Sequence, residues 1–163
     1  MKKVLKVFGL TILFLFIIYL IYAFTIENRV LMSIEIETYI PIFAKMEEKD
    51  NHGGFHGDGE SLAKIYFSEN QAKKFIEKIE KNEHWRELPM TETLQGYANY
   101  SYYEGMEIPF VENGYWFVLD RHSKATNKYD ENGIFEEGRY SRNYSVAVFD
   151  TAANILYYSE EDT

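Results

Sequence analysis

An uncharged run of 18 residues near the N-terminus, residues 7–24, constrains this chain more than any other feature. A helix of this length extends for about 27 Å, at about 1.5 Å per residue, which is close to the hydrocarbon thickness of a lipid bilayer. Tyr19 and Tyr22 lie near the end of the run, where aromatic rings favour the membrane–water interface. The run therefore predicts a transmembrane helix over residues 7–24, with the lipid bilayer as its partner.

A cleaved signal peptide is the alternative interpretation of this segment. Signal peptides have a shorter apolar region, which ends in small residues before the cleavage site. Here the run ends in Tyr22, Ala23 and Phe24, so the small-x-small pattern is absent. The chain also has no cysteine, so a lipidated cysteine cannot tether it. These features favour an uncleaved anchor over a signal peptide.

The charges around the run predict its orientation. Lys2, Lys3 and Lys6 precede it, and positively charged flanks remain in the cytoplasm. We therefore expect residues 1–6 to be cytoplasmic and the chain to be a single-pass protein of the cell membrane. Residues 25–42 are expected to form a membrane-proximal connector, and residues 43–163 one extracytoplasmic domain.

The composition of the outer part excludes some classes of function. Beyond residue 24 the chain has 14 basic and 26 acidic residues, a net charge of −12. Nucleic acid is therefore not an expected partner, because phosphate binding requires a basic surface. Without cysteine there is no disulfide framework, so the domain must be held together by its hydrophobic core. The chain has 14 tyrosines and 12 phenylalanines, and most of them lie beyond residue 24, where they supply large apolar side chains for that core.

One amphipathic helix is predicted over residues 68–81. Ser68 and Gln71 have the spacing of a capping box, and Glu69 places an acid in the first turn. Apolar side chains recur at the spacing of one buried helical face, at Ala72, Phe75, Ile76 and Ile79.

The strands are predicted from alternating or branched apolar residues. They comprise "SLAKIYF" (residues 61–67), "YWFVLD" (residues 115–120) and a C-terminal hairpin, "NYSVAVFD" and "ILYYSEED", joined by a tight turn. Ile34, Ile36 and Thr38 also alternate with acids in a strand-like pattern, although Pro41 would stop a central strand. The expected fold class is α+β: an N-terminal transmembrane helix and one small domain with an antiparallel sheet and one main amphipathic helix.

The glycine-rich stretch "DNHGGFHGDGE", residues 50–60, is the first candidate site. His52, His56 and Asp58 could ligate a divalent metal, with Asp120 or His122 as a fourth ligand. Because the glycines rule out a stable helix, the two histidines lack the shared helical face that suits zinc. A structural turn between two strands and a ligand-binding loop are the alternatives. We predict the turn, with "DRHS" (residues 120–123) packed against it.

"DRHS" itself allows two interpretations. Asp120 and His122 could join the metal site, or the motif could be a strand end at which Arg121 pairs with a carboxylate and His122 caps a turn. We predict the second arrangement.

Several motifs together resemble a known group of proteins. The N-terminal anchor, "DNHGGFHGDGE", "GYWFVLDRHS" and the final "VAVFDTAANILYYSEEDT" resemble an uncharacterised family of small membrane-anchored extracytoplasmic proteins of Gram-positive bacteria. The resemblance covers residues 50–163. It implies a cell type, but it carries no activity, cofactor or partner.

The function expected from the sequence is a non-enzymatic binding or interaction module without a cofactor, whose partner is a protein or a component of the cell wall. The alternative is a metal-dependent, zinc-type hydrolase that uses the loop of His52, His56 and Asp58 with help from His122.

Overall fold

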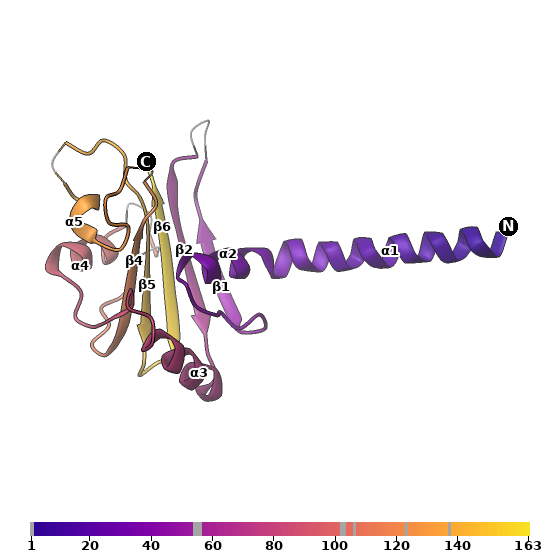
Figure 1. Cartoon of the computed structure of the whole chain (residues 1–163), viewed down its shortest axis with the longest axis horizontal. Coiled ribbons are helices and arrows are strands. Elements are labelled where there is room, and N and C mark those ends of the chain that lie inside the picture. The colour runs from indigo at the N-terminus through magenta and orange to yellow at the C-terminus, as the bar shows by residue number, and fades with distance from the viewer. Residues whose placement is uncertain (1, 54–56, 102–103, 106, 123, 137) are drawn as a thin grey trace.

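The computed structural model describes residues 2–53, 57–101, 104–105, 107–122, 124–136 and 138–163. Its central element is one antiparallel six-stranded sheet with the strand order β1-β2-β6-β5-β4-β3 (Figure 1). The strands are β1 (Lys45–Asp50), β2 (Gly59–Tyr66), β3 (Arg86–Glu87), β4 (Gly114–Asp120), β5 (Asn143–Asp150) and β6 (Ile155–Asp162). The helices are α1 (Lys2–Thr25), α2 (Glu27–Glu35), α3 (Glu69–Ile79), α4 (Glu92–Ala98) and α5 (Glu131–Ile134). The predicted α+β class and the antiparallel sheet are confirmed.

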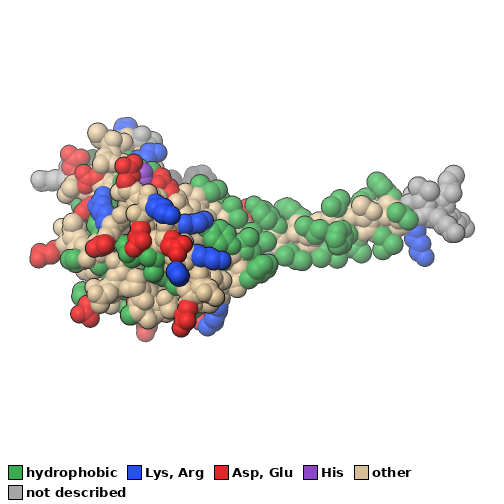
Figure 2. Space-filling view, turned by 60° about the horizontal axis from the view of Figure 1, so that its bottom comes forward, with side chains coloured by type: hydrophobic (Ala, Val, Ile, Leu, Met, Phe, Trp, Pro, Cys, Tyr) green, Lys and Arg blue, Asp and Glu red, His purple; other side chains and the backbone are tan. Residues whose placement is uncertain are grey.

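Helix α1 projects from the sheet domain as an isolated rod (Figure 1). Residues 6–23 are long and apolar enough to cross a membrane, and none of them is buried in the structure. In the space-filling view this stem is covered with apolar side chains (Figure 2). The predicted helix is thus present, while its insertion into a bilayer stays a prediction.

The segment after α1 differs from its predicted form. The alternation at residues 34–38 is strand-like, but the structure has helix α2 up to Glu35 and a turn at Ile36 and Glu37, and Met32 is buried within the helix. Met32 and Ile36 are four residues apart and both belong to the core with Ile40, so the spacing of one helical face outweighs the local alternation. The Trp85 indole donates a hydrogen bond to the Ile36 carbonyl at 2.9 Å. The predicted connector over residues 25–42 is therefore built into the folded domain from Met32 onward.

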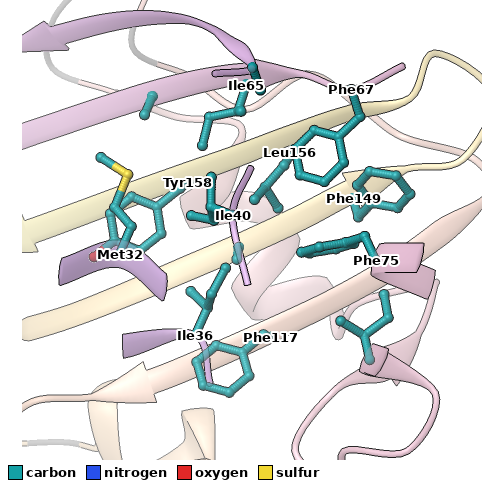
Figure 3. Close-up of a cluster of buried hydrophobic side chains, with 14 of the residues drawn as sticks. Met32, Ile36, Ile40, Ile65, Phe67, Phe75, Phe117, Phe149, Leu156 and Tyr158 are labelled. Atoms are coloured by element: carbon teal, nitrogen blue, oxygen red, sulfur yellow. The ribbon is translucent and has the colours of Figure 1, made fainter. Parts of the chain in front are cut away.

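The sheet is covered on both faces. One face carries the cluster around α2 and α3, in which Phe75, Phe117 and Phe149 lie close to Ile36 and Leu156 (Figure 3). The other face carries a second cluster under α4, α5 and the segment before β4, which includes Leu94, Ile108, Val118, Ile134 and Val148. Helix cover on this second face was not part of the prediction, which had one main helix.

The predicted amphipathic helix is confirmed as α3. The carboxamide oxygen of Gln71 accepts a hydrogen bond from the Ser68 amide at 2.8 Å, as in a capping box. Ala72, Phe75 and Ile79 form the buried face, whereas Ile76 is only partly buried at its border. The predicted strands at residues 61–67 and 115–120 and the C-terminal hairpin are confirmed as β2, β4 and β5–β6.

Candidate functional site

Polar residues gather where five strand ends meet at one end of the sheet. In the strand register Asp162 is opposite both Gly59 and Asn143, and Asp120 is opposite Tyr144. The glycine-rich stretch joins β1 to β2 at the same end. The prediction that this stretch connects two strands is therefore confirmed.

Arg121 is the centre of the first polar group, the Arg121 cluster. Its guanidinium lies 3.3 Å from Glu35 of α2, 3.6 Å from Glu160 and 3.1 Å from Asp162, both on β6. The predicted pairing of Arg121 with a carboxylate is thus confirmed, with three carboxylates instead of one. His52 joins the cluster, because its Nε2 lies 3.3 Å from the other oxygen of Asp162. Its Nδ1 lies 2.7 Å from Asp50.

Glu35 is the most perturbed acid of the Arg121 cluster. Burial and the nearby charge of Glu160 raise the pKa of Glu35 to about 7, against the opposing effect of Arg121. Tyr158 donates its hydroxyl to Glu35, and this hydroxyl also lies 2.8 Å from Glu160. The cluster therefore joins α2 to the ends of β4 and β6 through a shared set of charges and protons.

The described residues at the two ends of the glycine-rich loop lie close together. Gly57 has φ +74°, a left-handed conformation that disfavours other residues. A Cβ at Gly59 would lie 2.5 Å from the Cα of His52, so only glycine fits there. The Asp58 carbonyl accepts the Gly53 amide at 3.3 Å, and Asp58 is exposed. His56 lies outside the described residues.

A second polar group is an ion pair between Asp120 and Arg139. The side chain of Asp120 is fully buried and accepts hydrogen bonds of 2.6 and 2.7 Å from the two terminal nitrogens of Arg139. Burial alone would raise the pKa of Asp120, but the bonds from Arg139 and from the His122 amide outweigh it and lower this pKa. Arg139 also donates to the Gly133 and Ser141 carbonyls, so it fixes the segment between β4 and β5.

His122 belongs to the turn after β4. Its Nδ1 accepts a hydrogen bond from the Lys124 amide at 3.1 Å. This is the predicted turn-capping role, and it holds His122 beside Asp120 rather than beside His52. Ser123 of "DRHS" lies outside the described residues.

The Asp120–Arg139 pair lies in the wall of a large cavity, which we call the distal cavity. Its volume is about 750 Å³, and its lining comprises Asp120, His122, Lys124, Ala125, Thr126, Asn127, Asp130, Asn132, Gly133, Glu136, Gly138 and Arg139. A smaller cavity of about 270 Å³ shares Arg139 and adds Tyr97, Tyr100, Tyr140 and Arg142. Helices α4 and α5 lie on the side of the sheet opposite to the exit of α1 (Figure 1). The lining of the distal cavity comes from residues 120–139, the segment that carries α5.

The lining of the distal cavity suits a hydrophilic ligand. It combines three acids, Lys124, Arg139 and His122 with two asparagines and a threonine, and alanine is its one apolar residue. Such a wall offers hydrogen-bond donors and acceptors together with positively and negatively charged groups. Ala125 is the one residue of the lining with an apolar side chain, so the wall suits a lipid chain or a hydrophobic peptide less well than a polar ligand.

The structure divides the candidate metal ligands between two places. Among the described residues, no group of three histidine, aspartate or glutamate side chains is placed to hold a metal ion. His52 lies in the Arg121 cluster, whereas Asp120 and His122 line the distal cavity. A divalent metal stays an untested alternative, because His56 is not among the described residues.

Sequence reasoning missed several members of both groups. Arg139 is 19 residues from Asp120 along the chain, and no local pattern links them. Glu35 lies in the predicted connector, and Glu160 and Asp162 are polar residues of a predicted strand. Their alternation on β6 is the one signal that could have put them on a common face.

Comparison with models of protein families, with curated proteins and with solved structures found no match to this chain.

Proposed function

We propose that this protein is a single-pass membrane protein whose extracytoplasmic domain binds a hydrophilic ligand in the distal cavity. The observation that carries the proposal is α1, an apolar helix of membrane-spanning length in which none of the described residues 6–23 is buried. Exposure of so much apolar surface to water is unfavourable, and a bilayer removes it. Lys2, Lys3 and Lys6 favour a cytoplasmic N-terminus under the positive-inside rule.

The position of the distal cavity supports a binding role outside the cell. With α1 in the bilayer, we expect the distal cavity, which lies in the segment that carries α5, to be on the side of the domain away from the membrane. Its polar lining fits the hydroxyl, amide and carboxylate groups of wall polymers. The resemblance to anchored proteins of Gram-positive bacteria agrees with this choice. The ligand class we propose is therefore a component of the peptidoglycan wall, bound without chemical change.

A reporter fusion tests the topology. An enzyme that is active only outside the membrane is fused to Thr163, and a second fusion carries a reporter active only in the cytoplasm. We expect activity from the first fusion alone. Activity of the cytoplasmic reporter would overturn both the orientation and the location of the cavity.

Sedimentation with insoluble Gram-positive peptidoglycan tests the binding role. Ala125→Trp should fill the distal cavity and abolish co-sedimentation of the detergent-solubilised full chain. Ala153→Trp is the matched control, because Ala153 is exposed in the turn between β5 and β6. Equal sedimentation of the two variants, or none by the parent protein, would contradict binding at this cavity.

A further inference from the structure

The loop between α2 and β1 exposes an aromatic side chain without protein cover. Phe43 is 96% exposed, and Tyr39 is 50% exposed. Their neighbours Ile40 and Ala44 are buried in the core, so the loop is firmly attached while Phe43 points outward. Phe110 and Tyr140 are also highly exposed, so exposure alone does not identify a contact surface, and the position of Phe43 next to the stem decides what covers it.

This loop lies next to the exit of α1. The Ile26 amide donates to Tyr22 and the Val30 amide to Ile26, both at 3.0 Å, so α2 continues the helical path of α1. The chain then turns, and the purple loop before β1 reaches back towards the side from which α1 leaves (Figure 1). A bilayer around α1 would therefore have its outer surface beside this loop.

Charge around the loop is also compatible with a membrane surface. Residues 38–44 carry no charge, although the outer part of the chain has a net charge of −12. Arg29 donates to the Pro41 carbonyl at 3.3 Å, and the Lys78 ammonium lies 5.1 Å from the centre of the Tyr39 ring. Lys45 follows the loop directly, paired with Glu47. Figure 2 shows lysine and arginine side chains on the part of the domain that borders the stem.

We propose that the loop of residues 38–44 is a membrane-contact loop, in which Phe43 inserts among the lipid headgroups of the bilayer that holds α1. Arg29 and Lys78 then lie beside lipid phosphates, and the Tyr39 ring lies at the interface that aromatic residues favour. This inference rests on the proposed membrane anchor. It adds a second point of attachment, which fixes the tilt of the domain and keeps the distal cavity directed away from the membrane.

Spin labelling of the full chain tests this contact, and the absence of native cysteine makes each label unique. Three single variants are prepared, Phe43→Cys, Leu15→Cys and Phe110→Cys, in vesicles of phosphatidylcholine and phosphatidylglycerol. Leu15 reports on α1, and Phe110 is a matched phenylalanine, 72% exposed, in the segment between α4 and β4. Collision with oxygen marks a label in lipid, and collision with a water-soluble nickel complex marks a label in water.

The expected result is a ratio of oxygen to nickel collisions that is several-fold higher at residues 15 and 43 than at residue 110. A lipid signal at residue 15 with a water signal at residue 43 would overturn the contact loop and leave the anchor in place. Water signals at both positions would overturn the anchor as well. Spin–spin broadening at residue 43 with protection from both reagents would show that a second copy of the chain covers Phe43, which also overturns the proposal.

Discussion

At the scale of single residues, the buried ion pair of Asp120 and Arg139 should dominate the stability of the distal cavity. Asp120→Asn leaves the Arg139 guanidinium without its carboxylate, and breaking such a pair costs roughly 3–5 kcal/mol of unfolding free energy. Because the pKa of Asp120 is lowered in the folded state, its contribution is complete at neutral pH and is lost as the pH falls below about 4. Urea unfolding at pH 7 measures the loss, with the exposed acid variant Asp58→Asn as the control. Equal midpoints for the two variants would contradict the role of the pair.

Glu35 should make the unfolding free energy depend on pH in the direction opposite to that of Asp120. Its pKa is about 7 in the folded state, because of burial and the charge of Glu160, and is lower in the unfolded chain. The folded state therefore binds the proton more tightly, so this acid lowers the unfolding free energy as the pH rises from about 4.5 to about 7. Glu35→Gln should flatten that slope. Thermal melts of both proteins at several pH values measure it, and parallel curves would exclude Glu35 as the source.

Substitutions at Gly57 and His56 distinguish a structural turn from a metal site in the glycine-rich loop. Its φ of +74° makes Gly57→Val strained, at a cost of roughly 1–3 kcal/mol, without any contact being lost. His56→Ala should cost less if the loop is a turn. Under the metal alternative this order is reversed, and a chelator lowers the melting temperature of the parent protein. Melts with and without chelator therefore decide between the two readings of the loop.

At the scale of elements, α3 offers a matched pair of isoleucines. Ile79 is 1% exposed, whereas Ile76 is partly buried at the edge of the same face. Ile79→Ala should cost roughly 2–5 kcal/mol, because it leaves a cavity in the closed core. Ile76→Ala should cost distinctly less, because solvent can fill the space. Urea unfolding of both variants tests which residue is central to the face, and a larger loss at Ile76 would reverse the assignment.

The elements also show what the sequence could predict. Helix α3 and the β5–β6 hairpin were predictable because their periodicity and their ends are encoded within a few residues. Helix α2 was not, because the alternation of Ile34, Glu35 and Ile36 imitates a strand. The Arg121 cluster and the Asp120–Arg139 pair were not predictable as groups, because strand register and loop closure, rather than local pattern, bring their members together.

At the scale of the whole molecule, the stem is an exposed apolar helix, whereas the sheet domain has a buried hydrophobic core. The described side chains of α1 are mostly exposed and none belongs to a core cluster, while the core begins at Met32. The boundary of the folded unit therefore lies near residue 27, rather than at residue 43 as the sequence predicted. The chain between these two positions supplies Glu35 to the Arg121 cluster as well as apolar cover to the sheet.

Two truncations test this boundary. A chain of residues 27–163 should be soluble and should melt close to the temperature of the full protein in detergent, because it keeps both core clusters. A chain of residues 43–163 loses Met32, Ile36 and Ile40, whose burial contributes roughly 1.5–3 kcal/mol each, and uncovers the sheet over β2 and β6. The combined loss is comparable to the whole stability of an ordinary domain, about 5–15 kcal/mol. We therefore expect residues 43–163 to give no cooperative transition in near-ultraviolet circular dichroism. A cooperative transition of residues 43–163 at the same temperature as residues 27–163 would contradict this boundary. In that case α2 would be a detachable connector, and the Arg121 cluster would not hold α2 to the sheet.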